Sequence, residues 1–446
     1  MSVFLGLKMN VEKVNIDRTN TRPPKSGKGR NFLLHLHPYR MPEANLRFTH
    51  TWGLGGMAVT LILMQLFTGI LLRFHYEASP QAAYDSIQRI QEGLVFGKFV
   101  RNIHHWSGMF LIVITFLHLV RVFLSGAFAA PRHWNWVIGV ALLLSVVFIN
   151  FTGYLLPWDQ LSYWAVTVST NMLDYVPWAG QWFKELIRGG VEVGAATLLN
   201  FYTFHTGVFP ALLVVLMLIH FWKVRKAGGV ILPRNISSSE VVRVETNPHL
   251  IKREAVVALA LLAFVFLFGT IIDAPLQEKA NPAFSPNPAK APWYFQGIQE
   301  LILHFHPFFA VVIIPLILLA GVVAIPFLKY SGSDGEVDFT KASYHKIILW
   351  SAITAIVFTP VLIVMDEYVL HPEEFFTSVP TFISEGLVPF LFLVGMTWLF
   401  IVFIKKKFSN KKIDLVLALF VLFTAAYLIL MFFGTFLRGA EMHLAF

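Results

Sequence analysis

The 446-residue sequence contains no cysteine and little charge: Asp, Glu, Lys and Arg together make up 14% of it. The missing cysteine excludes disulfides, a cysteine-ligated iron–sulfur cluster and a covalent c-type haem attached through Cys-x-x-Cys-His within this chain. Soluble domains carry about 25% charged residues, so the low charge excludes an ordinary cytosolic protein. Hydrophobic residues reach 56% and fall into blocks of about 20 residues, the length that crosses a bilayer.

Nine apolar blocks predict nine transmembrane helices, since a helix satisfies its own backbone hydrogen bonds in lipid. The blocks lie near residues 51–74, 104–124, 134–156, 201–222, 255–273, 307–328, 347–365, 386–404 and 413–434. The predicted fold is an all-α polytopic membrane protein, with a four-helix bundle followed by about five further transmembrane helices.

The charges between the blocks predict the orientation of the chain. Nine Lys and Arg residues precede the first block and the fourth and eighth connections are also basic, whereas the seventh, residues 366–385, holds five acidic residues and no basic one. By the positive-inside rule the N-terminus is cytoplasmic, in a multi-pass protein of the inner (cytoplasmic) membrane. The net charge of +9 therefore indicates a lipid membrane as partner and no nucleic acid.

Four histidines recur at nearly equal spacing in two of the blocks. His104 and His118 are 14 residues apart, and His205 and His220 are 15 apart. At about 100° per residue, 14 steps fall roughly 40° short of four turns and 15 steps overshoot by roughly 60°, so each pair lies on one helix face. Because the two helices are antiparallel, His104 is expected at the depth of His205, and His118 at the depth of His220.

Two histidines facing each other across antiparallel helices are the ligands that a six-coordinate b-type haem requires. The spacing therefore predicts two non-covalent b-type haems, with the four histidines as axial ligands of the iron. Zinc fits less well, since each level offers two ligands and no Cys, Asp or Glu beside them. Interhelical hydrogen bonding or a proton relay is the alternative role of these histidines.

Glycines at the same spacing support the prediction of two haems. Gly55 and Gly69 in the first block, and Gly139 and Gly153 in the third, are 14 residues apart. They would let a porphyrin approach the backbone, although small-residue helix packing is an alternative. Three arginines near the membrane boundaries could bind haem propionates or act as snorkelling anchors. They are Arg101, Arg121 and Arg225.

The run from Arg101 to Arg121 resembles the haem-binding second helix of the cytochrome b family, the membrane subunits of quinol–cytochrome c and plastoquinol–plastocyanin oxidoreductases. Residues 152–165, Thr-Gly-Tyr-Leu-Leu-Pro-Trp-Asp-Gln-Leu-Ser-Tyr-Trp-Ala, resemble the family's surface helix over the quinol-oxidation pocket. The resemblance covers roughly residues 35–365. The 15-residue spacing of His205 and His220 resembles that of the chloroplast and cyanobacterial branch. That branch usually splits the protein into two chains, whereas a single chain contains both parts here.

The resemblance implies the dihaem subunit of a quinol–cytochrome c oxidoreductase. Quinol would be oxidised at the outer face with bifurcated electron transfer: one electron to a Rieske iron–sulfur protein, the other across the membrane to a quinone-reduction site, coupled to proton translocation. The implied partners are quinone, the Rieske protein, a c-type cytochrome subunit and a second copy of the complex in a homodimer. The candidate quinol-site residues are Tyr154, Pro157, Trp293, Tyr294 and Glu300.

Four regions are expected along the chain. They are a basic cytoplasmic segment (1–48), the four-helix dihaem core (49–230), a C-terminal cytochrome b part with the quinol-site loop (231–365) and additional transmembrane helices (366–446).

Three features depart from the family pattern. Gly53 stands where the chloroplast-type branch has the cysteine that attaches an extra haem, so no covalent haem is possible. The family's Pro-Glu-Trp-Tyr motif reads Ala-Pro-Trp-Tyr at 291–294, so Pro292 replaces the glutamate that takes a proton from quinol, and Glu300 is the predicted substitute. The third is a ninth helix, beyond the family's usual eight.

Two other functions share part of this pattern. A dihaem membrane anchor of a dehydrogenase or reductase would need the four histidines but neither the Pro-Trp-Asp-Gln segment nor the Trp-Tyr loop. A transporter with no redox role would need no matched spacing of histidines and glycines.

Overall fold

The computed structural model describes residues 39–232, 241–328, 330, 339–369, 378–408 and 410–445. Within these ranges nine helices are long and apolar enough to cross a membrane, which confirms the predicted all-α polytopic fold. Most of the basic N-terminal segment lies outside the described residues, as do Glu373 and Glu374 of the acidic connection.

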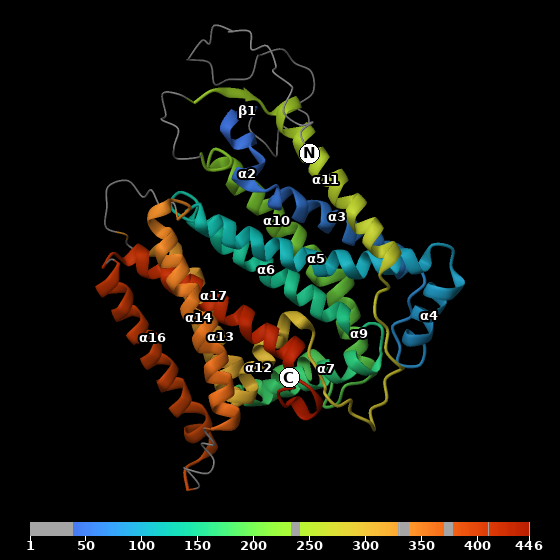
Figure 1. The fold of residues 1–446 in the computed structure, drawn as a ribbon. Helices are drawn as coiled ribbons and strands as arrows, with labels where there is room; N and C mark the ends of the chain where they lie inside the picture. The colour runs from blue at the N-terminus through green and yellow to red at the C-terminus, as the bar shows by residue number, and fades with distance from the viewer. Residues whose placement is uncertain are drawn as a thin grey trace.

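The first four spans form the bundle that carries the four histidines (Figure 1). They are α3 (Leu54–Arg73), α5 (Gly97–Leu124), α6 (His133–Tyr154) and a fourth span made of α9 (Ala195–Thr203), η3 (Phe204–Val208) and α10 (Phe209–Lys226). Helix α3 packs along α5, and α6 packs along α10. Buried side chains from all four spans enter a shared apolar core, among them Leu61, Leu111, Val146 and Leu213. Burying apolar surface stabilises a fold by about 25 cal/mol per Å² when that surface is removed from water. Lipid is itself apolar, so inside the membrane the four helices are held together mainly by their close packing.

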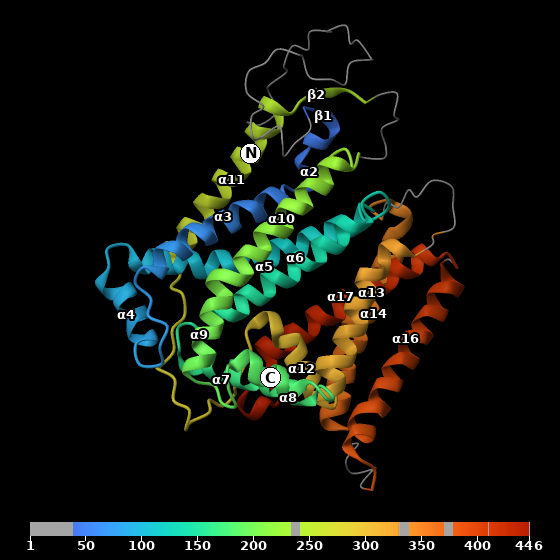
Figure 2. The ribbon, with the colours of Figure 1, turned by 180° about the vertical axis from the view of Figure 1, so that it is seen from behind.

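Five further spans complete the described part of the chain. They are α11 (Thr246–Ile271), η6–α13–η7 (Phe308–Phe327), α14 (Ala342–Tyr368), η8–α16 (Phe382–Lys407) and α17–η9 (Lys412–Leu437). Helix α11 packs against α3 and α5, and α17 packs against α14. Figure 2 shows α17 running diagonally from the end of α16 toward the C-terminus, where it meets α12.

Short helices gather at one end of the bundle, called here the α12 face. They are α7 (Gln160–Asn171), η2 (Met172–Tyr175), α8 (Gly180–Arg188), η5 (Trp293–Phe295) and α12 (Gln296–His304). Helix α4 (Ala83–Gly93) joins α3 to α5. Because α7 and α8 follow span three while η5 and α12 follow span five, the α12 face combines both halves of the chain.

The opposite end, called here the ribbon face, joins the N-terminal region to the connection between α10 and α11. Strand β1 (Arg40–Pro42) pairs antiparallel with β2 (Arg243–Glu245), with Met41 opposite Val244. The Thr246 amide donates to the Tyr39 carbonyl at 3.0 Å. Two basic connections thus lie at the same end of the molecule, as the charge pattern predicts. A short turn, η1 (Glu43–Leu46), and α2 (Phe48–Thr51) lead from the ribbon into α3.

Candidate functional site

The structure brings the histidines together in the two expected pairs. The ring centroids of His104 and His205 lie 6.1 Å apart, with the ring planes at 79°. His118 and His220 lie close enough to interact electrostatically. The two pairs are stacked along the bundle, the first toward the α12 face and the second toward the ribbon face.

A π-helical turn explains why the two histidine spacings differ by one residue. Residues Phe204–Val208 form this turn around His205. A π turn bonds residue i to residue i+5 and so holds one more residue than an α turn. The 15 steps from His205 to His220 therefore cover about the rotation of 14 α-helical steps, as between His104 and His118. Counting 100° per residue missed this local geometry.

Each of the four glycines lies beside one histidine ring. A Cβ built on each glycine would come close to the nearest atom of its histidine. The distances are 3.2 Å for Gly69 and His104, 2.4 Å for Gly153 and His205, 3.6 Å for Gly55 and His118, and 3.7 Å for Gly139 and His220. The missing side chains of α3 and α6 thus let a histidine ring lie close to the helix backbone at both histidine levels. A flat cofactor between the helices requires this kind of close backbone approach.

The hydrogen bonds of the first pair leave one nitrogen of each ring available. The His104 Nδ1 lies 2.9 Å from the Thr68 hydroxyl, and the His205 Nδ1 lies 2.8 Å from the Ile149 carbonyl. Partners of this kind orient a metal-ligating imidazole and leave its Nε2 for the metal. In the second pair the Nδ1 atoms of His118 and His220 are buried and make no hydrogen bond of ordinary geometry within the described residues.

The donor set at each level fits a metal whose remaining ligands come from a bound group. Within the described residues, no three His, Asp or Glu side chains are grouped so that they could hold a metal ion. A closed zinc site needs about four protein ligands, so two histidines alone do not build one. A haem iron takes most of its ligands from the porphyrin, so the two histidines of each pair would suffice to hold it from the protein side.

Arg101 is committed to contacts inside the protein. Its guanidinium donates to the Gln91 side chain, to the Ala274 carbonyl at 2.9 Å and to the Pro275 carbonyl at 2.6 Å. The buried arginine thereby ties the start of α5 to the segment that follows α11. Its contact with a haem propionate stays a prediction, and would have to use the guanidinium donors that these bonds leave over.

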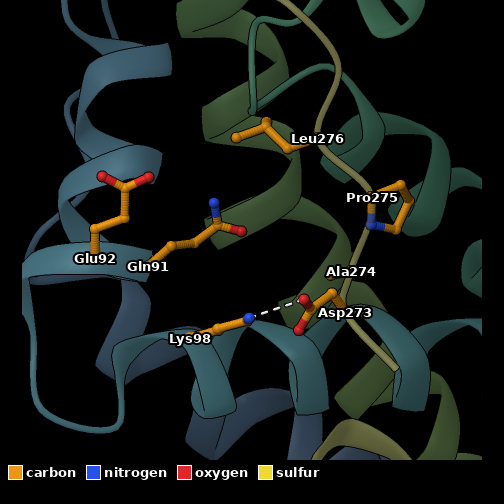
Figure 3. Close-up of a pocket in the computed structure, with 7 residues that line it drawn as sticks. All are labelled: Gln91, Glu92, Lys98, Asp273, Ala274, Pro275 and Leu276. Atoms are coloured by element: carbon orange, nitrogen blue, oxygen red, sulfur yellow. Dashed lines mark ion pairs between the residues drawn. The ribbon is translucent and has the colours of Figure 1, made fainter. Parts of the chain in front are cut away.

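A hollow of about 380 Å³ lies beside these Arg101 contacts (Figure 3). Lys98 and Asp273 form an ion pair across its floor, with Nζ and Oδ2 2.8 Å apart. Lys98 lowers the pKa of Asp273 by donating a hydrogen bond to it, as does Asn102. The hollow is polar and open, so it belongs to the surface rather than to either histidine level.

The other two predicted arginines lie toward the ribbon face. Arg121 donates to the His50 carbonyl from Nε at 3.1 Å and Nη2 at 2.7 Å. Arg225 borders a hollow of about 260 Å³ together with Trp222 and Lys226. Arg121 follows His118 and Arg225 follows His220 along their helices, and their contact with haem propionates stays a prediction.

The two segments expected around quinol are pinned to each other at the α12 face. The Asp159 Oδ1 accepts from the Ser162 amide at 2.9 Å, which caps the N-terminus of α7. Its Oδ2 accepts from the Gln277 amide at 3.0 Å, and the Gln160 amide donates to the Glu278 carbonyl at 2.8 Å. Pro157 precedes this cap, in the turn between α6 and α7. One aspartate thus both starts a helix and holds the loop after α11.

Trp293 and Tyr294 enter the bundle from this loop. The Trp293 Nε1 donates to the Met109 Sδ at 3.2 Å. Tyr294 is 5% exposed, and burial beside Tyr154 raises its pKa. Its hydroxyl has no hydrogen-bond partner among the described residues. A buried hydroxyl left unpaired costs about 1–3 kcal/mol, so a polar ligand atom placed against it would restore that energy.

Glu300 is fully buried in α12 and lies in an ion pair that the sequence did not reveal. Arg438, which follows the ninth span, donates to both carboxylate oxygens, from Nε at 3.0–3.1 Å and from Nη2 at 2.5 Å. The His304 Nε2 lies 3.3 Å from the Glu300 Oε1, and the His304 Nδ1 lies 2.6 Å from the Asp366 Oδ2. The only sign of this ion pair in the sequence was that one arginine, Arg438, follows the ninth apolar block.

Paired histidines at two depths of a helical membrane bundle, each beside a glycine, are the arrangement expected of a class of polytopic proteins that hold flat cofactors between their helices. The sequence comparisons identify the family within that class. Residues 41–228 match the family described as cytochrome b/b6/petB. The chain belongs to this cytochrome b family, and membership implies that it binds b-type haem.

Two relatives show how the match is distributed. Cytochrome b6 of Chlamydomonas reinhardtii is 42% identical over 190 residues, which is 43% of this chain and 86% of the relative. Cytochrome b6 of Heliomicrobium gestii is 38% identical over 192 residues, or 43% of this chain and 88% of the relative. Nearly the whole of these relatives is therefore matched by less than half of this chain.

A solved structure extends the likeness of fold to most of the chain. A chain described as "Hyperthermophilic respiratory Complex III" aligns with a TM-score of 0.64 over 89% of this chain and 94% of that chain, at 22% identity. At that identity the likeness concerns the fold alone, but it includes the spans after the four-helix bundle.

Proposed function

We propose that this chain is the dihaem cytochrome b subunit of a quinol–cytochrome c oxidoreductase. The observation that carries the proposal is the pairing of His104 with His205, with ring centroids 6.1 Å apart and a glycine beside each ring. That separation would leave room for one metal ion between the two rings. The second pair repeats the arrangement nearer the ribbon face.

In this proposal the four histidines are the axial ligands of two non-covalent b-type haems. When bound, the haems supply one-electron carriers at two depths of the membrane. Thr68 and Ile149 orient the first pair of rings through Nδ1. The four glycines would let the macrocycles approach the helix backbone, and Arg101, Arg121 and Arg225 are the candidate cations for their propionates.

Quinol is the proposed substrate at the α12 face. Tyr154, Pro157, Trp293 and Tyr294 would line its pocket, since Asp159 fixes the α7 cap against the loop after α11. The Tyr294 hydroxyl, which has no hydrogen-bond partner among the described residues, is the group proposed to bind a quinol oxygen. Glu300 and His304, which lie in contact, are the proposed proton-accepting pair.

The proposal includes bifurcated electron transfer, with a quinone-reduction site at the ribbon face and proton translocation between the two sites. The ribbon face would then be cytoplasmic, in the inner membrane of the cell. The partners would be a Rieske iron–sulfur protein and a c-type cytochrome, because the chain has no cysteine for either centre, and the complex would be a homodimer. Residues 1–48, 49–230, 231–365 and 366–446 would be its basic segment, dihaem core, quinol-site part and additional helices.

The test is a haem assay followed by a redox titration of the purified chain and an oxidant-pulse experiment on the complex. We expect two b-type haems per chain with separable potentials. A pulse of oxidant given to the Rieske and cytochrome c partners, in the presence of quinol, should reduce b-type haem as it oxidises quinol. A dihaem anchor would show two haems without this oxidant-induced reduction, and one haem or none would contradict the four-histidine assignment.

A further inference from the structure

The ninth span is packed directly onto the helix that follows Trp293 and Tyr294. The Tyr427 hydroxyl donates to the Tyr294 carbonyl at 2.8 Å. A Cβ on Gly297 of α12 would lie 2.6 Å from the Tyr427 ring, and a Cβ on Gly434 would lie 2.8 Å from the Gln296 side chain. Such close approach at two glycines shows that the ninth span and α12 are closely packed, next to Tyr294 of the proposed quinol site.

Beyond this contact, the chain continues from the ninth span into a buried ionic cluster. Besides Glu300, Arg438 contacts the Glu367 carboxylate, and it donates to the Met442 carbonyl at 2.9 Å. The side chains of Glu300 and Arg438 are 0% and 2% exposed. The Leu444 amide donates to the Glu367 Oε1 at 2.9 Å. The last described residues thus fold back to hold the arginine in place.

A chain of polar contacts leads from this buried pair toward the surface. The Glu300 Oε1 is 3.3 Å from the His304 Nε2, and the His304 Nδ1 is 2.6 Å from the Asp366 Oδ2. Exposure of the side chains rises along the same line, from 0% at Glu300 to 10% at His304 and 31% at Asp366. An imidazole between two carboxylates can accept a proton on one nitrogen and release one from the other.

The charges around His304 favour its protonated form. Burial acts to lower the pKa of His304, but its hydrogen bonds to Asp366 and Glu300 outweigh burial and raise it. For Glu300, burial acts to raise the pKa, but the hydrogen bonds from His304 and Arg438 prevail and lower it. Three other charged or titratable groups face the cluster. They are Glu367, bound to Arg438, Lys290, whose charge acts on Glu300, and His443, 3.9 Å from Glu367.

We propose that Glu300, His304 and Asp366 carry the protons of quinol from the pocket to the outer surface, and that Arg438 makes the ninth helix part of this path. This inference rests on the proposed function. An O–H bond of quinol breaks as a proton passes to Glu300, and the Glu300 Oε1 passes it to the His304 Nε2. The proton on Nδ1 then leaves to Asp366 and to water. The second O–H proton of quinol follows the same path in turn, so two protons leave as quinone forms, and the two electrons go to the Rieske protein and the b-type haem.

Arg438 is the positioning residue of this path. Because the guanidinium stabilises the ionised carboxylate, Glu300 does not retain the proton, which therefore rests on His304. The arginine also keeps the Glu300 oxygen directed at the His304 ring, since Nε and Nη2 hold both carboxylate oxygens. A lysine, which cannot make the bidentate contact, should preserve the charge but not the geometry.

The experiment measures quinol oxidation by the intact complex as a function of pH, with the haem spectrum as a check of assembly. A positioned general base contributes about 10²–10⁴-fold to a rate, so His304→Gln should slow quinol oxidation by about 10²-fold or more. Asp366→Asn removes a carboxylate that raises the His304 pKa, so the acidic limb of the profile should shift to lower pH. His306→Gln is the matched control. Its ring contacts Tyr175 and Phe382 outside the cluster, and its profile should match wild type.

The outcomes separate the path from the proposed function. His304→Gln with a normal rate and an unmoved acidic limb would overturn the path while leaving the proposed function standing. If His304→Gln loses its haem spectrum, the test passes to Asp366→Asn, because Asp366 is partly exposed. In that variant, an acidic limb of the pH profile at the wild-type position would overturn the proposed path. If the wild-type complex binds haem but oxidises no quinol, that result would contradict the proposed function, and the proposed proton path as well.

Discussion

The sharpest prediction concerns Gly153→Ala. A methyl group on this residue would lie 2.4, 2.8 and 3.1 Å from three atoms of the His205 ring, whereas ordinary contacts begin near 3.4 Å. The ring must therefore retreat by about 1 Å, the difference between 3.4 and 2.4 Å. That movement would pull the His205 Nδ1 away from the Ile149 carbonyl, now 2.8 Å distant. The variant thus disturbs both the position and the orientation of one axial ligand.

The expected loss can be estimated from the cost of overpacking. Adding a methyl group to a closely packed site costs about 1–3 kcal/mol. At 1.4 kcal/mol per tenfold change in affinity, haem affinity at the His104–His205 level should fall by roughly 5- to 150-fold. Gly139→Ala is the matched control, since its methyl would lie 3.7 Å from His220, in ordinary contact. Gly69→Ala, at 3.2 Å from His104, should fall between the two.

The assay is the haem content of each purified variant, with a redox titration that resolves the two components. Gly153→Ala should lose or shift one component and leave the other at its wild-type potential. Two unchanged components in Gly153→Ala would refute the reasoning, as would a greater loss in Gly139→Ala.

Three further predictions concern the α12 face. Asp159→Ala removes a helix cap worth about 1 kcal/mol and releases the Gln277 amide, so KM for quinol should rise in steady-state assays while both haems remain. Tyr294→Phe removes the unpaired hydroxyl, so thermal stability should be unchanged or higher while quinol binding, measured by titration, weakens. Arg438→Gln leaves a buried carboxylate uncompensated, at about 3–5 kcal/mol, and should lower the melting temperature. The pKa of Glu300 is lowered in the folded state. The ion pair therefore stabilises the folded protein above the unfolded-state pKa of Glu300, and this stabilisation is lost as the pH falls through the folded-state pKa. The loss of stability caused by Arg438→Gln should therefore shrink below about pH 4.

The histidine pairs and their glycines could be predicted because helix periodicity is a local property of sequence. Two residues 14 apart return to one face of any α-helix, and antiparallel neighbours then match depths without further information. The structure places Gly69 and Gly153 beside His104 and His205, as this reasoning requires. The nine spans could also be predicted from local sequence, since the thickness of a bilayer sets the length of each apolar block.

Contacts between distant parts of the chain could not be predicted in this way. Glu300 and Arg438 are separated by 138 positions, and no spacing rule relates an acid on a short helix to an arginine after the last span. The same holds for Arg101, whose guanidinium binds carbonyls after α11. Its proximity to His104 in sequence suggested a role near haem, but its strongest contacts are tertiary.

The altered quinol motif and the ninth helix are best understood together. Pro292 stands where the resemblance to the family leads one to expect a glutamate, and a proline side chain accepts no proton. Glu300, on the helix that follows, provides a carboxylate that is 0% exposed. An ionised carboxylate at such a site is too costly without a cation and hydrogen bonds, and Arg438 supplies both from the end of the ninth span. The acid therefore depends on the added helix, and the buried arginine depends equally on the acid. A chain that lost its ninth helix would keep its four histidines but would have to neutralise Glu300, and with it the path through His304.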